Sequence, residues 1–252
     1  MIKSHIHIPY NKIYEYLDLI TKEKFNLEIY FNSQSLDHIK PKDIEKLKNS
    51  LSYEISLSFH GPFMDLSPGA VDSKVRKVTI DRFNQVFDIA EVLNPKSIVF
   101  HSGYEKWKYA FKVNTWLDAS LRTWENFLSK AEKLNIKIAI ENIFEEDPEN
   151  LRRLVEKISS PYFGVCFDTG HFNLFSKISL EEWISSLSDY IFEVHLHDNN
   201  KEFDEHLAIG SGCFDFKRFF QLFKNKNCIY TIEAHKIEEV LKSIEMLNQL
   251  IK

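Results

Sequence analysis

The stretch from residue 137 to residue 199 contains three apolar runs that end in metal-binding side chains: KIAIE (137–141), VCFDTGH (165–171) and FEVHLHDN (192–199). Three more runs have the same form: SLSFH (56–60), SIVFH (97–101) and YTIEAH (230–235). Short apolar runs of this kind are typical of strands buried on both faces. Because each run stops at or just before a histidine or a carboxylate, we expect the ends of these strands to meet at one site.

The same pattern extends over the whole chain. Strands are predicted at Ile2–Ile8, Leu27–Phe31, Ile55–Phe59, Ser97–His101, Lys137–Glu141, Phe163–Asp168, Phe192–Leu196 and Ile229–Glu233. Helical spacing of apolar residues predicts helices at Ile13–Thr21, Asp43–Lys48, Lys74–Leu93, Thr115–Leu134, Pro148–Ile158, Leu180–Leu187, Phe216–Phe223 and Ile237–Ile251. Eight such units favour an α/β fold, a (β/α)₈ TIM barrel in a single domain over residues 1–252. The alternative, an open doubly wound sheet, would need a Gly-rich phosphate loop after the first strand, and IHIPYNK has none.

Two helix starts carry capping signals. Asp147 precedes Pro148, which predicts an N-cap followed by proline at the first helical position. Ser179 is followed by Glu182, the spacing of a capping box. Both signals support the predicted boundaries.

Composition limits the class of protein. Of the 252 residues, 44% are hydrophobic and 27% charged, an ordinary globular balance, and we expect the 21 phenylalanines to fill the core. A net charge of −5 argues against nucleic acid as a partner without excluding a local basic patch. Cys166, Cys213 and Cys228 form no CxxC motif, which favours reduced thiols and a cytoplasmic location. We see neither a signal-peptide apolar segment nor a membrane-length run, so no membrane partner is expected, and the oligomeric state stays open.

The strand ends carry more ligand-type residues than a fold needs. Side chains two apart on a strand share a face, so Glu193, His195 and His197 point the same way. Any one histidine here could simply be a hydrogen-bonded core or surface residue. Three carboxylates converging on one barrel mouth would repel one another, however, and a divalent cation with imidazole ligands removes that repulsion. The set therefore predicts a metal site.

The ordered series of motifs resembles a known superfamily. FHGPF, VFHSGYE, IAIEN, CFDTGH, EVHLHDN, DEHLAIGSG and IEAH together resemble the xylose isomerase-like, endonuclease IV-type TIM barrels over nearly the whole chain. The resemblance implies that one divalent ion is held by Glu141, Asp168, His195 and Glu233. It implies that His171 faces substrate, and that further ions are held by His60, His101, His171, Asp204 and His206. His197 shares the face of His195 and could take its ligand role.

The chain departs from each subgroup of that superfamily. The endonucleases carry DNA-inserting loops with arginine and aromatic residues, whereas the loops here are short and lack such clusters. The sugar epimerases typically have an arginine after the HxH segment, where this chain has Asn199, Asn200 and Lys201.

The first functional hypothesis is isomerisation or epimerisation of a small-molecule sugar or sugar-phosphate. Zn²⁺ or Mn²⁺, at one to three ions per chain, would stabilise an enediolate as a Lewis acid. Glu141 and Glu233 would be the catalytic acid and base, with His171, His195 or His197 orienting hydroxyls. A phosphate could rest on the turn Gly210, Ser211 and Gly212, which could equally be a simple bend.

The alternative is an endonuclease IV-like multinuclear zinc hydrolase of phosphodiesters or phosphoesters. Five histidines, two aspartates and two glutamates carry four formal negative charges, so three divalent ions would leave a net charge of about +2, suited to a phosphate ester. One ion with Glu141, Asp168 and Glu233 would leave about −1, suited to a neutral polyol. A non-enzymatic binding module is a third possibility that would not need so many ligands. We favour the isomerase class because small-molecule members predominate in the superfamily.

Overall fold

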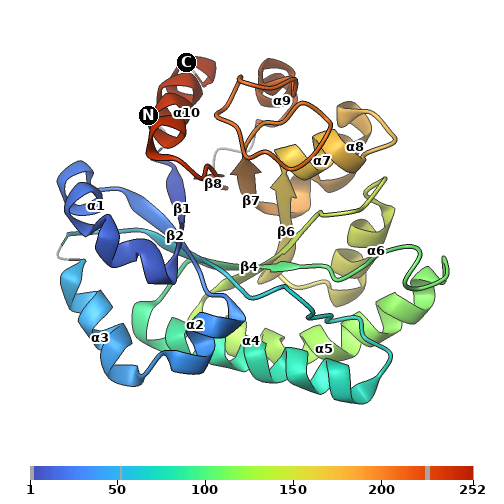
Figure 1. Ribbon diagram of the computed structural model, residues 1–252. Helices are drawn as coiled ribbons and strands as arrows, with labels where there is room; N and C mark the ends of the chain where they lie inside the picture. Colours follow the sequence, from blue (N-terminus) through green and yellow to red (C-terminus); the bar gives the residue numbers. More distant parts are fainter. Residues whose placement is uncertain (1–2, 52, 225–227, 252) are drawn as a thin grey trace.

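The strands close on themselves in sequence order. In the computed structural model, which describes residues 3–51, 53–224 and 228–251, eight parallel strands form a barrel from β1 to β8, and β8 pairs with β1 (Figure 1). The strands are β1 His5–Pro9, β2 Asn26–Tyr30, β3 Leu57–His60, β4 Ser97–His101, β5 Lys137–Glu141, β6 Phe163–Asp168, β7 Ile191–Leu196 and β8 Ile229–Ile232. The predicted (β/α)₈ barrel is confirmed.

Helices surround this sheet on the outside (Figure 1). They are α1 Leu17–Glu23, α2 Ser33–His38, α3 Pro41–Ser50, α4 Ser73–Leu93, α5 Val113–Leu134, α6 Glu149–Ile158, α7 Thr169–Phe175, α8 Leu180–Leu187, α9 Phe216–Leu222 and α10 Ile237–Leu250. Two 3₁₀ helices, η1 Tyr10–Glu15 and η2 Ser188–Tyr190, lead into α1 and β7. None of the helices in the described ranges combines the length and apolar character that crossing a membrane requires.

Several predicted boundaries agree with the structure to the residue, among them β4, β5, β6 and α8. The first strand was expected from Ile2, which lies outside the described residues, and it runs from His5 to Pro9. Two helices were not predicted, α2 and α7, because each has only six or seven residues and shows no repeated apolar stripe. The capping box of Ser179 and Glu182 is present.

The predicted start of α6 was one residue early. Pro148 itself is the N-cap, with φ −80° and ψ −4°, and the helix begins at Glu149. Asp147 still caps the first turn, because its Oδ1 accepts a hydrogen bond from the Glu149 N–H at 2.9 Å.

Alternation along the strands separates an apolar shell from a polar interior. Outward-facing side chains pack against the helices, and aromatic rings fill that layer, as Phe83, Phe100 and Trp124 do with ring centroids 4.2–5.5 Å apart between β4, α4 and α5. Inward-facing positions of β7 carry Glu193 and His195, both fully buried. The barrel interior is therefore where the ligand-type side chains meet.

Candidate metal centre

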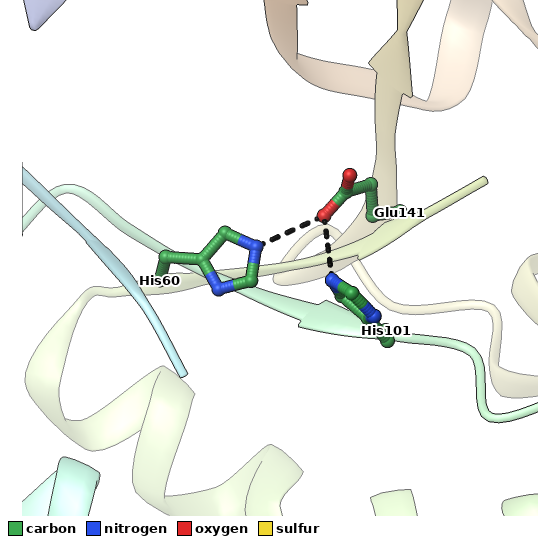
Figure 2. A group of neighbouring side chains, drawn as sticks. All are labelled: His60, His101 and Glu141. Carbon is green, nitrogen blue, oxygen red and sulfur yellow. Dashed lines mark hydrogen bonds and ion pairs between the residues drawn. The ribbon is translucent and has the colours of Figure 1, made fainter. Parts of the chain in front are cut away.

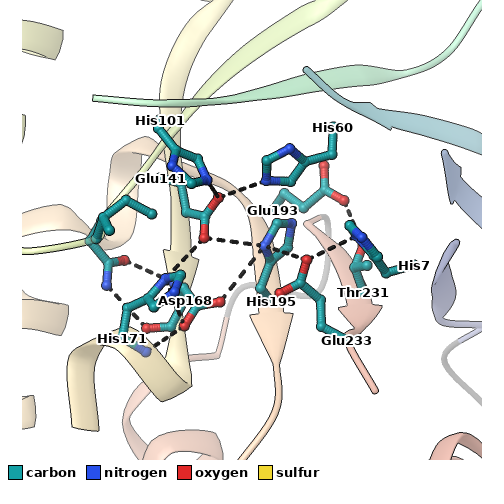
Figure 3. A network of polar contacts seen from close by, with 12 residues as sticks. His7, His60, His101, Glu141, Asp168, His171, Glu193, His195, Thr231 and Glu233 are labelled. Carbon is teal, nitrogen blue, oxygen red and sulfur yellow. Dashed lines mark hydrogen bonds and ion pairs between the residues drawn. The ribbon is translucent and has the colours of Figure 1, made fainter. Parts of the chain in front are cut away.

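Three carboxylates from three strand ends surround one imidazole nitrogen. Nδ1 of His195 lies 3.7 Å from Oε1 of Glu141, 3.8 Å from Oδ2 of Asp168 and 3.4 Å from Oε1 of Glu233. All four residues are at most 5% exposed. Figure 3 shows the carboxylates of Glu141, Asp168 and Glu233 turned toward the His195 ring. We call these four residues the carboxylate cluster.

The other nitrogen of the His195 ring is fixed by a residue that the sequence did not single out. Its Nε2 hydrogen-bonds Oε2 of Glu28 on β2 at 3.0 Å, and Glu28 is fully buried. Oε1 of Glu28 also contacts Nδ1 of His7 at 2.8 Å, and that nitrogen lies 2.9 Å from Glu233. The available signal was a lone glutamate inside an apolar run, LEIYF, and a histidine pair in HIHIP.

A second group lies beside the first, at the ends of β3 and β4. Oε2 of Glu141 lies 3.0 Å from Nε2 of His60 and 3.4 Å from Nε2 of His101 (Figure 2). Glu141 thus faces the carboxylate cluster with one oxygen and this histidine pair with the other. Glu141 therefore links the first predicted ligand set to His60 and His101, which were predicted to hold a further ion.

A third group lies on the other side of Asp168. Nε2 of His197 is 3.0 Å from both oxygens of Asp168, and Nδ1 of His171 is 3.3 Å from Oδ1. Asp204 in the loop after β7 reaches this group, with Oδ2 3.4 Å from Nε2 of His171 and 3.0 Å from Nε2 of His206. All nine predicted ligands therefore converge at one end of the barrel.

Local hydrogen bonds hold Asp168 in place. The side-chain amide of Asn142 donates to the Asp168 carbonyl at 3.1 Å and accepts from the Asp168 N–H at 2.8 Å, so it continues the β5–β6 pairing by one residue. Oδ1 of Asp168 also accepts from the His171 N–H at 2.6 Å and caps α7. That cap brings His171, three residues on, back toward the carboxylates.

The residues next to Asp168 make room for His197. The hydroxyl of Thr169 donates to the His197 carbonyl at 2.9 Å and so ties α7 to the end of β7. A Cβ atom at Gly170 would lie 2.0 Å from Cε1 of His197, closer than real Cβ contacts come. Glycine is therefore required at 170 for the imidazole to reach Asp168.

Burial and the neighbouring titratable groups act in opposite directions on the pKa values of the cluster. Burial would raise the pKa of Glu141, but the neighbouring His101 and His195 hold it well below the usual value. Burial likewise opposes charge on His195, yet the neighbouring Cys166, Glu233 and Glu28 raise its pKa well above normal. Burial raises the pKa of Glu233, and the charges of His195 and His7 bring it well below normal. In the metal-free state the raised pKa keeps a proton on the His195 ring, and this charge offsets part of the negative charge of the surrounding carboxylates.

A different polar layer lies deeper in the barrel. Glu193, two residues before His195, accepts hydrogen bonds from the hydroxyls of Ser58, Ser97 and Thr231 at 2.6–3.0 Å. Burial, followed by the nearby charge of Glu28, raises the pKa of Glu193 to about 8. We call Glu193 and these three hydroxyl residues the hydroxyl layer.

A cavity of about 1120 Å³ opens above the carboxylate cluster, and its wall includes Glu141, His171 and Glu233. His197, predicted to contact substrate, is fully buried, is not part of this wall and stacks under His206 at 4.0 Å between ring centroids. The predicted phosphate turn at 210–212 is not part of the wall either. Two of its N–H groups make internal hydrogen bonds, Ser211 donating to the Ala208 carbonyl and Gly212 to Asp198.

Three histidines of the site each have a ring nitrogen without a hydrogen-bond partner among the described residues. Nδ1 of His171, His195 and His197 is buried, and among the described residues none of the three finds a hydrogen-bond partner. Several triads have ligand atoms within 4.8 Å of one another, including His60–His101–Glu141, Asp168–His171–His197 and His197–His206–Glu233. The site thus contains candidate metal-binding groups of the nitrogen and oxygen type that suit zinc and manganese.

With this geometry established, the chain belongs to the xylose isomerase-like TIM barrel family, whose sequence model matches residues 24–250. It is 31% identical over 225 residues to the uncharacterized protein MJ1311 of Methanocaldococcus jannaschii, covering 85% of this chain and 77% of that protein.

Solved structures resemble the whole barrel. A D-tagatose 3-epimerase-like protein superposes with a TM-score of 0.81 at 28% identity, covering 98% of this chain and 97% of the other. The TTHB071 protein of Thermus thermophilus, soaked with ZnCl₂, gives a TM-score of 0.83 at 22% identity, covering 99% and 98%. The second likeness is one of fold.

Proposed function

We propose that this protein is a divalent-metal-dependent isomerase or epimerase of a sugar or sugar derivative. The observation that carries the proposal is the buried Nδ1 of His195, which has three carboxylates at 3.4–3.8 Å. Membership of the xylose isomerase-like family and the likeness to a D-tagatose 3-epimerase-like protein support it.

The residues fit a divalent cation. One imidazole and three carboxylates, all buried, make a nitrogen–oxygen donor set, and Glu28 would hold the outer nitrogen of the His195 ring as carboxylates commonly do behind a metal-binding histidine. A bound Mn²⁺ or Zn²⁺ would supply Lewis-acid stabilisation of an enediolate at the substrate carbonyl. His195 rather than His197 is the proposed ligand, because its Nδ1, which has no hydrogen-bond partner among the described residues, is the nitrogen that faces all three carboxylates.

Proton transfer is assigned to Glu141 and Glu233. Both line the cavity, at the end of β5 and just past β8, and both approach the same nitrogen of His195, so a carbon held between them is within reach of either. The depressed pKa of each leaves it ionised and able to accept a proton. His171 and His101, also in the cavity wall, would bind the hydroxyls on either side of the reacting carbon.

Isotope exchange tests this assignment even while the substrate is unidentified. The metal-loaded protein is incubated in D₂O with a panel of ketoses and aldoses, D-tagatose and D-fructose among them, and substrate and product are read by NMR. Deuterium at the carbon next to the carbonyl, in step with the new epimer or isomer, supports proton transfer. Conversion without any exchange, or no conversion across free and phosphorylated sugars, would count against it.

Phosphoester hydrolysis is the second candidate, favoured by the extra triads around Asp168 and Glu141. Asp204 is 37% exposed and joins His171 and His206, so it could complete a second or third metal position. Elemental analysis decides between the two functions. Two or three equivalents of metal that fall with Asp204→Ala plus His206→Ala would favour the hydrolase. One equivalent, unchanged by those substitutions, would leave Asp204 and His206 to bind substrate.

A further inference from the structure

The cavity above the metal centre has two chemically different ends. One end is walled by the charged and imidazole side chains already described. The other end is walled by Ile6, Ile8 and Leu27 of β1 and β2, and by Ile20 of α1 and Val240 of α10. These five residues are 1–8% exposed, and the half-buried Leu19, Phe25 and Ile237 belong to the same wall, so this end is an apolar space between the barrel and two helices. The polar side chains that line it are Lys12, Tyr16 and Lys236. We call it the apolar lobe.

Strand β1 divides the two ends. Because side chains alternate along a strand, His7 points into the barrel at Glu28 and Glu233, while Ile6 and Ile8 point out toward the helices. Pro9 at the end of β1 and Ala234 just past β8 also line the cavity, and β1 and β8 are paired. The lobe is thus reached from the metal centre over the tops of these two strands.

An apolar space of this kind is unfavourable when it is empty. Its walls forgo dispersion contacts, and water entering it finds few polar partners. The whole cavity, about 1120 Å³, is at the upper limit of ordinary ligand sites, and a single monosaccharide would occupy only its polar end. Both points favour a ligand that fills the lobe with apolar atoms.

We propose that the apolar lobe binds a hydrophobic substituent of the substrate, so that the substrate is a sugar carrying an alkyl or aryl group rather than a free sugar. The substituent would leave one carbonyl and its neighbouring carbons free at the metal centre. This inference rests on the proposed function for the sugar end, whereas binding in the lobe can be measured in metal-free protein.

The probes are n-alkyl β-D-glucopyranosides from methyl to octyl, below their micellar concentrations, titrated by calorimetry into metal-free and Mn²⁺-loaded protein. Affinity is expected to rise about fourfold for each methylene group, the gain from taking one CH₂ out of water, and to level off when the lobe is full. An affinity that does not depend on chain length in either form of the protein would overturn the proposal.

Two matched substitutions on α10 test whether the alkyl chain of the probe binds in the apolar lobe. Val240→Phe should fill the lobe and remove the dependence on chain length, while leaving Mn²⁺ affinity unchanged. Leu241→Phe, at the adjacent position, which is 44% exposed and outside the cavity wall, should behave as wild type. If Val240→Phe does not fold, Ile20→Ala serves instead, because it enlarges the lobe and should move the plateau to longer chains. A chain-length dependence that neither lobe variant alters would place the alkyl group elsewhere and contradict the proposal.

The outcomes separate this inference from the proposed function. If binding depends on alkyl chain length but no substrate proton exchanges, the proposal for the apolar lobe stands and the proposed isomerase function is rejected. If free sugars are converted and alkyl chain length has no effect on binding, the proposed isomerase function stands and the proposal for the apolar lobe is rejected.

Discussion

Two sets of buried acidic side chains lie one above the other in this barrel, and they differ in how they are neutralised. In the hydroxyl layer Glu193 receives three hydroxyl hydrogen bonds, and burial raises its pKa to about 8, so it is mostly protonated at neutral pH. In the carboxylate cluster Glu141 and Glu233 face histidines, and their pKa values are held well below normal despite burial. The same strand, β7, supplies Glu193 to one layer and His195 to the other.

The comparison teaches that burial of a carboxylate does not by itself mark a functional site. The hydroxyl layer satisfies its own hydrogen bonds and needs nothing further. The carboxylate cluster and its neighbours keep three buried imidazole nitrogens without hydrogen-bond partners among the described residues. Buried nitrogens without hydrogen-bond partners, next to a cavity, are what distinguish a set of candidate metal ligands from a purely structural hydrogen-bond network.

The largest expected difference between the layers is in catalysis. Glu233→Gln or Glu141→Gln should lower kcat by about 10²- to 10⁴-fold, because each removes a group that accepts a proton. Glu193→Gln is the matched control in the hydroxyl layer and should keep kcat within about twofold, since a neutral amide replaces a neutral carboxyl. Steady-state kinetics with circular dichroism to verify folding measures both. Normal turnover by either cluster variant would refute the acid–base assignment.

Metal affinity should show the next largest effect. Glu28→Gln removes the carboxylate behind His195, and we expect divalent-metal affinity to fall about 10- to 100-fold. Competition titration with a chromophoric chelator measures it. Glu145→Gln is the control, because that buried carboxyl hydrogen-bonds Ser102 and the Ile143 N–H instead of a cluster histidine. Equal affinities for the two variants would mean that Glu28 does not position the ligand.

The hydroxyl layer predicts a pH dependence of its own in metal-free protein. The pKa of Glu193 is about 8 when folded against an ordinary 4.5, so between these values the folded state binds the extra proton and wild-type stability falls as pH rises. Relative to wild type, Glu193→Gln should therefore gain up to about 1.4 kcal/mol per pH unit across this window and nothing below it. Urea unfolding at pH 4, 6 and 8 measures the difference. A constant difference would show that Glu193 is ionised when folded.

A smaller, local effect is expected at the helix that presents Asp168. Gly170→Ala forces a methyl group against the His197 ring and should reduce the free energy of unfolding by about 1–3 kcal/mol. The same substitution in a His197→Ala background removes the clash, so most of that loss should disappear. Equal losses in both backgrounds would assign the effect to the backbone of α7 instead.

The sequence predicted the barrel and the meeting of nine candidate ligand residues because both depend on local features, apolar runs and the side chains at their ends. Glu28 and His7 were not identified from the sequence, because their importance depends on contacts with residues at the ends of β7 and β8, far along the chain. The sequence also could not distinguish the roles of Glu193 and Glu141, since both lie in apolar strands. Their environments differ only in the structure, where hydroxyls surround Glu193 and histidines contact Glu141. The short helix α7 shows no repeated apolar stripe, and its one capping signal, Asp168, had been interpreted only as a ligand.

The most direct test of the account is divalent-metal binding to three matched proteins, purified without chelators and then titrated with Mn²⁺ and Zn²⁺ while the unfolding temperature is followed. Wild type and Glu193→Gln should bind at least one equivalent and gain thermal stability, whereas Glu141→Gln with Glu233→Gln should lose both. Because His195 holds a proton in the metal-free state, metal binding should release that proton and weaken as pH falls. Failure of wild type to bind either ion, or equal binding by all three proteins, would contradict the claim that the carboxylate cluster is a metal centre.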